Sequence, residues 1–224
     1  MLKTPSLIET VRVRDGRAPL WHLHLRRLVA SCRTLGIPFP LEFDIPSGGT
    51  DRVQRIVVGM KGKQVTEREV GSVEPVRLIT ARQAHQPYPH KTADRTQFAE
   101  ASAEAASAGA DDALMLTVEG MVAECTIWTV FWWDGPTLVA PSLRLGILPS
   151  VSRSRIAEIG PVTERVVPRD ALNGVPIILA NAARGIVPVA RLDGQPVPPT
   201  PGRHSCNGGS GTPYPEDWRK LDRP

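Results

Sequence analysis

Long apolar runs and clustered charge are both scarce in this sequence of 224 residues. The longest apolar runs are far shorter than the roughly 20 residues that span a membrane, so we expect no membrane partner. No run of five like charges occurs and the net charge is only +4, so nucleic acid is not an expected partner. No positively charged stretch leads into an apolar segment at the start, so we expect no signal peptide.

Cysteine is equally scarce. Cys32, Cys125 and Cys206 are odd in number and lack the spacing of metal ligands, so we predict no metal site and no disulfide framework. The expected location is therefore reducing and cytoplasmic. Apolar residues make up 41% and charged residues 22% of the chain, which are ordinary values for a globular protein that can bury a core.

The first 84 residues are expected to form a small α/β domain. Alternating apolar and polar residues predict a strand over Leu7–Val13, and apolar residues at helical spacing predict a helix over Trp21–Leu35. Residues 38–50 are rich in proline and glycine and predict a loop, and residues 75–81 predict a strand. Residues 52–60 fit a helix or a strand.

Residues 85–194 are expected to form a larger domain dominated by strands. Residues 83–90 contain two prolines and two histidines, which predicts a linker or domain boundary. An alanine-rich helix is predicted at 96–108 and a short helix at 152–159. The tail, 195–224, is rich in Pro, Gly, Ser and Asn, which predicts irregular structure. The predicted strands cover residues 113–117, 121–126, 129–133, 137–140, 176–180 and 186–192.

Two ionisable residues stand in positions with chemical potential. Lys91 directly precedes the alanine-rich helix, and a lysine that forms a Schiff base must lose its proton, which burial or the nearby charges of Arg95 and His90 would favour. Glu124 lies inside an apolar strand, where a carboxylate needs a partner. The alternatives are a solvated lysine at a helix start and a glutamate on an edge strand facing water.

Two further segments could bind an anion. Residues 146–153 form a loop that leads into a helix start with Ser152, and backbone N–H groups with a hydroxyl at such a start suit a phosphate. Arg27 on the first helix could add a charged donor. The alternatives are an ordinary helix cap and a surface charge.

The order of these segments along the chain resembles the class IV aminotransferase family, which includes branched-chain aminotransferases, D-amino acid transaminases and 4-amino-4-deoxychorismate lyases. The resemblance covers roughly residues 6 to 194. The matching segments are LIETVRV at 7–13 with Asp15-Gly16, HLRRL at 24–28 with Ser31, HKT at 90–92 with Arg95, GADDALML at 109–116 leading to GMVAE at 120–124, LPSVSR at 148–153 and ANAARGIVPV at 180–189.

The resemblance implies an α/β (α+β), two-domain, fold-type IV enzyme that binds pyridoxal 5'-phosphate. It implies that Lys91 holds the cofactor as a Schiff base and moves the substrate proton, and that Glu124 pairs with the pyridine nitrogen so that the ring can accept electrons. The other implied contacts are the phosphate clamp Arg27, the phosphate cup of Val151 and Ser152, the neighbouring Asn181 and Ala182, and Ala183 beside the substrate carboxylate.

The sequence also departs from the family pattern. Glu9 lies much closer to Met1 than the family's ET strand normally lies to the start, which implies an N-terminally truncated form with an altered substrate pocket. Ser150 replaces a common glycine and Thr129 a frequent asparagine. Trp128, Trp132 and Trp133 are expected in the core or at a dimer contact, with a pocket wall as the alternative.

The short form and the VAEC segment at 122–125 are similar to the lyases of the family. The resemblance then implies an amino-acid-like substrate, 4-amino-4-deoxychorismate, that loses pyruvate to give 4-aminobenzoate for folate synthesis. Alternatives are a branched-chain or D-amino acid aminotransferase, a non-catalytic relic of the family, and a phosphate-binding module without catalysis. A homodimer is expected, because family active sites take residues from the partner subunit and apolar surface needs cover.

Overall fold

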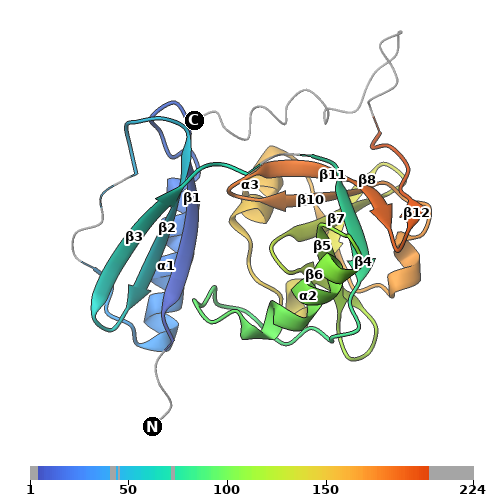
Figure 1. The fold of residues 1–224 in the computed structure, drawn as a ribbon, viewed down its shortest axis with the longest axis horizontal. Coiled ribbons are helices and arrows are strands. Elements are labelled where there is room, and N and C mark those ends of the chain that lie inside the picture. The colour runs from blue at the N-terminus through green and yellow to red at the C-terminus, as the bar shows by residue number, and fades with distance from the viewer. Residues whose placement is uncertain (1–4, 41–43, 45, 72–73, 202–224) are drawn as a thin grey trace.

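A computed structural model describes residues 5–40, 44, 46–71 and 74–201, and two β-sheets organise this part of the chain (Figure 1). The smaller sheet is antiparallel, in the order β1-β2-β3. Its strands are β1 (Leu7–Val13), β2 (Arg52–Gly59) and β3 (Gly62–Arg68), and one helix, α1 (Trp21–Leu35), covers it.

The two faces of the small sheet have different surroundings, because successive side chains of a strand point to opposite faces. Leu7 and Val11 of β1 and Ile56 of β2 pack with Leu28 of α1 in one buried cluster. Ile8, Thr10, Arg55 and Arg68 belong to the other face, which borders the main pocket. The small sheet therefore contributes side chains to the site from the face that α1 leaves uncovered.

The larger sheet has nine strands, arranged in the order β6-β5-β4-β11-β10-β7-β8-β9, with β12 paired to β11. Two parallel pairings join β4 to β5 and to β11, and the pairing of β8 with β9 is also parallel. The strands are β4 (Val76–Thr80), β5 (Asp112–Leu116), β6 (Val122–Cys125), β7 (Thr129–Asp134), β8 (Thr137–Pro141), β9 (Thr163–Arg165), β10 (Ile177–Asn181), β11 (Gly185–Leu192) and β12 (Gln195–Pro196).

Short helices lie around the larger sheet. α2 (Ala99–Ser107) continues the 3₁₀ turn Thr96–Phe98 and packs against β5. α3 (Val151–Ile159) contacts both β10 and α1, so it joins the two sheets next to the pocket. Two further 3₁₀ turns cover Leu143–Leu145 and Arg169–Leu172.

Most of the elements predicted from sequence are confirmed, within a residue or two at their ends. The ambiguous segment 52–60 is strand β2, whereas β3 was not predicted because every residue in it is exposed. β4 lies in the larger sheet, so the chain passes between the sheets before the boundary expected at residue 84. Of the tail expected to be irregular, β12 pairs with β11 and residues 202–224 lie outside the described residues.

None of the helices in the described part is long and apolar enough to cross a membrane.

Candidate active site

A pocket of about 220 Å³ lies where the two sheets meet, and it is lined by residues of β1, α1, the loops around Lys91 and α3, and the β10–β11 turn. The structure brings seven of the eight predicted site residues to its wall. They are Arg27, Lys91, Glu124, Val151, Asn181, Ala182 and Ala183. Ser152, the next residue of α3, is buried and is not part of the wall.

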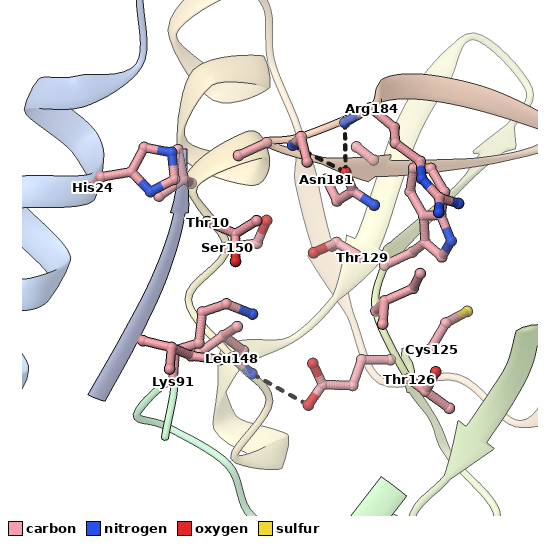
Figure 2. A pocket seen from close by; sticks show the side chains of 18 of the residues that line it. Thr10, His24, Lys91, Cys125, Thr126, Thr129, Leu148, Ser150, Asn181 and Arg184 are labelled. Atoms are coloured by element: carbon pink, nitrogen blue, oxygen red, sulfur yellow. Dashed lines mark hydrogen bonds between the residues drawn. The ribbon is translucent and has the colours of Figure 1, made fainter. Parts of the chain in front are cut away.

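Backbone hydrogen bonds to the small sheet fix Lys91 in place. The Ile8 N–H donates to the Lys91 carbonyl at 2.8 Å, and Ala93 N–H donates to the Ser6 carbonyl at 2.7 Å. The side chain points into the pocket (Figure 2). Burial first, and then the positive charges of Arg27 and Arg95, lower the pKa of Lys91 to about 7, so much of the amine is uncharged and nucleophilic at neutral pH.

A buried network behind Lys91 holds Arg27. Glu9 accepts hydrogen bonds from Arg27 Nε at 2.8 Å and from His24 Nδ1 at 2.7 Å. Burial alone would raise the pKa of Glu9, but the Arg27 charge and these hydrogen bonds outweigh it and lower the pKa to about 2. Burial also lowers the pKa of His24, so this side chain orients Glu9 as a neutral imidazole.

Arg27 keeps donors free for an anion. A guanidinium has five N–H groups. Two of them point to Glu9 and one donates to the Pro149 carbonyl at 3.2 Å. The remaining two can serve a phosphate at the wall of the pocket, as the sequence predicts.

Glu124 has a partner that the sequence did not identify. His85 Nε2 lies 2.8 Å from Glu124 Oε1, and both side chains are buried. The Leu148 N–H points to the same oxygen at 3.4 Å. No hydrogen bond from the described residues reaches Oε2 of this pocket-lining carboxylate, so Oε2 is available to accept a proton donor from the pocket.

The start of α3 supplies further donors. Ser150, not Ser152, caps the helix, and its hydroxyl accepts from the Arg153 N–H at 3.4 Å. The Ser152 hydroxyl is buried with no hydrogen-bond partner. Because an unpartnered buried hydroxyl costs about 1–3 kcal/mol, its retention here fits a ligand that accepts from it.

Asn181 shapes the β10–β11 turn. Its Oδ1 accepts from the N–H groups of Ala183 at 3.1 Å and Arg184 at 2.8 Å, as Figure 2 shows. The Ala183 N–H is therefore already engaged, and its carbonyl accepts from Arg12 Nη1 at 3.2 Å. Substrate binding through the Ala183 amide, which the resemblance implies, would require this turn to rearrange.

Comparison with known proteins agrees with this architecture. Residues 6–45 and 56–192 match the amino-transferase class IV family. The chain belongs to this family. It is 26% identical over 208 residues to a candidate aminodeoxychorismate lyase of Schizosaccharomyces pombe, covering 83% of this chain and 89% of the relative.

Solved structures show the same fold at low identity. A candidate 4-amino-4-deoxychorismate lyase of Legionella pneumophila superposes with a TM-score of 0.78 at 24% identity, covering 89% of this chain and 87% of that one. The branched-chain amino acid aminotransferase of Escherichia coli superposes with a TM-score of 0.75 at 18% identity, covering 87% and 79%. The predicted family, the fold class and an enzyme of a pyridoxal-phosphate-dependent family are thus confirmed.

The residues present fit that cofactor. Lys91 offers an amine with a pKa of about 7, and Glu124 offers a free carboxylate oxygen for a protonated ring nitrogen. Arg27, the N–H groups that begin α3 and the orphaned Ser152 hydroxyl offer converging donors for a phosphate. These groups come from both sheets, so the complete set exists only in the folded chain.

The sequence reasoning missed several residues that line the pocket or hydrogen-bond to its lining residues. Glu9 lies in the ET segment, in a predicted strand, and this position was the available signal that its carboxylate needs a cationic partner. His85 gave no such signal, because it lies in a proline-rich segment. Trp128 forms pocket wall, while Trp132 and Trp133 are core residues. The remaining missed lining residues include Thr10, Arg55, Arg68 and Arg184.

Proposed function

We propose that this protein is a lyase that releases pyruvate from 4-amino-4-deoxychorismate and leaves 4-aminobenzoate, a precursor for folate synthesis. The observation that carries the proposal is the buried Lys91, with a pKa of about 7, in one pocket with Arg27 and Glu124. The lyase assignment is supported by the Schizosaccharomyces pombe relative, which matches across most of both chains.

We assign the roles as follows. Pyridoxal 5'-phosphate, when bound, supplies an electron sink for the carbon that bears the substrate amine. Glu124 Oε2 would hold a proton on the ring nitrogen. Arg27, Val151 and Ser152 would hold the phosphate, next to Asn181 and Ala182. Lys91 would hold the cofactor through its side-chain amine, and the same Nζ would take the proton from the amine-bearing carbon of the substrate.

All the atoms of the two products come from the substrate. The C–H bond at the amine-bearing carbon and the neighbouring C–O bond break, pyruvate leaves, and the ring becomes aromatic. The proton taken by Lys91 Nζ is available to the leaving group, so the reaction needs no oxidant or added amino acceptor.

A branched-chain or D-amino acid aminotransferase is the second candidate. It is favoured by the shared fold, because the same Lys91 could return the proton to the cofactor side and so pass the amine to a 2-oxo acid. A panel assay separates the two. Aminodeoxychorismate should yield equal amounts of 4-aminobenzoate and pyruvate, whereas branched-chain L-amino acids and D-alanine should react only slowly. The reverse preference would replace the lyase by the aminotransferase.

We also propose a cytoplasmic homodimer. Cys32 and Cys125 are unpaired thiols, as in a reducing compartment. Ile127, at the pocket wall, is 50% exposed and would be covered by a partner subunit. Light scattering at micromolar concentration should give twice the chain mass, and a monomer would contradict this assembly.

A further inference from the structure

The pocket carries more positive charge than the proposed cofactor site uses. Its wall includes one carboxylate among the described residues, Glu124, which is held by His85. Six cationic side chains line the same wall, namely Arg27, Arg55, Arg68, Lys91, Arg95 and Arg184.

Three of these six are already engaged. Arg27 is paired with Glu9, and Lys91 is the proposed attachment point. The Arg95 guanidinium lies 4.0 Å from the centre of the Phe98 ring and donates to the Thr126 carbonyl. Because these three side chains are engaged in this way, we do not assign them to the binding of a second anion.

The other three arginines have no acidic partner. Within the part of the chain that the structure describes, Arg55, Arg68 and Arg184 make no ion pair with a carboxylate, and Arg68 donates only to the Glu69 carbonyl at 3.2 Å. Like charges that line one pocket repel one another and attract ligands of the opposite charge. Three unpaired ones on one pocket wall therefore indicate a site for negative charge.

Arg184 is held in a fixed place. Its guanidinium lies 5.8 Å from the centre of the Trp128 ring. On its other side is Gly71, where an added Cβ would lie only 3.0 Å from Nη2. Figure 2 shows Arg184 across the pocket from Lys91. Because the aromatic ring and the backbone at Gly71 both lie close to the guanidinium, they restrict the side chain before any ligand arrives.

Arg55 and Arg68 approach from the small sheet. They lie on the face that α1 leaves uncovered, together with Arg12. Arg12 Nη1 donates to the Ala183 carbonyl, next to Arg184 in the chain, so this face meets the β10–β11 turn. The three unpaired arginines thus border one pocket from both the small sheet and the β10–β11 turn.

We propose that Arg184, with Arg55 and Arg68, forms a subsite for the carboxylates of a substrate that carries two of them away from its amine-bearing carbon. This inference rests on the proposed function, and it deepens it. 4-Amino-4-deoxychorismate carries two carboxylates, neither of them on the amine-bearing carbon. A branched-chain amino acid carries one, on that carbon, and would leave the subsite unused.

Binding of two unreactive ring acids tests the subsite. Chorismate carries two carboxylates and shikimate one, and neither has an amine that could react with the cofactor. Titration calorimetry on the protein saturated with pyridoxal phosphate should show chorismate binding at least about tenfold more tightly than shikimate, as extra charge-assisted hydrogen bonds predict. Arg184→Gln should weaken chorismate binding about tenfold and shikimate binding less than twofold.

Two further variants test whether the position of the Arg184 guanidinium causes the preference for chorismate. Arg191→Gln removes an exposed arginine of β11, the strand that follows Arg184. Its side chain donates to Gly194 outside the pocket, so this variant should change neither affinity. Gly71→Ala keeps Arg184 but displaces its guanidinium, and should weaken chorismate binding selectively.

Equal affinities of the wild type for the two acids would overturn the subsite, as would an equal loss of both in Arg184→Gln. A loss of cofactor affinity in Arg184→Gln, with the preference for chorismate intact, would assign Arg184 to the phosphate instead and overturn the proposal too. Cofactor uptake is read separately by visible absorbance. Absent uptake would sink the proposed function, while titration of the cofactor-free protein with the same two acids would still decide the anion subsite.

Discussion

At the scale of single residues, the environment of Lys91 determines its chemistry. A lysine in water is protonated until pH values near 10, and a protonated amine cannot attack an aldehyde. Burial and the charges of Arg27 and Arg95 lower the pKa of Lys91 to about 7. The uncharged fraction therefore increases as the pH rises through 7 and is nearly complete by pH 9.

This pKa predicts how cofactor attachment depends on pH. The rate at which the apoprotein gains a visible absorbance band after pyridoxal phosphate is added should rise between pH 6 and 8 and then level off. Stopped-flow absorbance measures it. A rate that keeps rising about tenfold per pH unit from 8 to 9.5 would show that Lys91 titrates as an ordinary lysine.

His85 is expected to act on the cofactor ring through Glu124. His85→Phe removes a buried hydrogen bond to a carboxylate, worth about 1.5–3 kcal/mol, so kcat/KM should fall about 10- to 100-fold. His85→Gln restores a donor and should recover part of the loss, with a parallel recovery of the visible band.

The matched control is His22→Gln, an exposed histidine on α1, which should leave activity unchanged. If His85→Phe retains the wild-type spectrum and kcat/KM, the histidine has no positioning role.

At the scale of elements, the start of α3 has a buried hydroxyl without a hydrogen-bond partner, which we propose donates to a ligand. Ser152→Ala removes a buried hydroxyl that has no partner, so the apoprotein should be equally stable or up to about 1 kcal/mol more stable. Its affinity for pyridoxal phosphate should nevertheless fall about tenfold, because one phosphate donor is lost. Urea unfolding and a cofactor titration measure the two effects.

Ser154→Ala, two residues further along α3, is the control and should change neither quantity. A destabilised Ser152→Ala apoprotein with unchanged cofactor affinity would mean that the hydroxyl serves the fold alone.

The hydrogen bonds of Glu9 in β1 with Arg27 and His24 in α1 should make the free energy of unfolding depend on pH in the acidic range. Glu9 has a folded pKa of about 2 and an ordinary value of 4.5, so its ionised form stabilises the fold above pH 4.5. That stabilisation, on the order of 3 kcal/mol, is lost as the pH falls from 4.5 towards 2. Glu9→Gln should lower the free energy of unfolding at pH 6 and flatten its decline between pH 4.5 and 3.

Urea unfolding at pH 6 and pH 3 measures the difference, with the exposed pair variant Glu67→Gln as the control. A decline that is equally steep in Glu9→Gln and in the wild type would exclude Glu9 as its source.

Elements with a one-sided apolar pattern could be predicted from sequence, and those without one could not. β1 alternates apolar and polar residues and α1 carries an apolar stripe, so both elements could be predicted from the sequence. β3 is exposed throughout and owes its structure to pairing with β2, which leaves no periodic signal. β9 has the same character.

The candidate site divides in a similar way. Lys91, Glu124 and Arg27 lie in family segments, so their order along the chain identified them. His85 lies outside the family segments, and Arg184 lies in one without an implied role. The proposed roles of both depend on contacts with distant residues, which no local pattern records. The Glu124–His85 contact joins residues 39 positions apart.

At the scale of the whole molecule, the pocket exists because two sheets meet. Arg27 comes from the helix on the small sheet, and Glu124 comes from a strand of the large one. Lys91 lies on the segment that hydrogen-bonds to the edge of β1. The small-sheet part holds no partner for the ring nitrogen, and the large-sheet part lacks the proposed phosphate donor Arg27.

The central claim is that this one lysine carries the cofactor. The protein is incubated with pyridoxal phosphate, reduced with borohydride, digested and analysed by mass spectrometry. We predict a single pyridoxyl group on the peptide that contains Lys91, and none on that peptide in Lys91→Ala. A label at other lysines only, or equal labelling of the wild type and Lys91→Ala, would contradict the account.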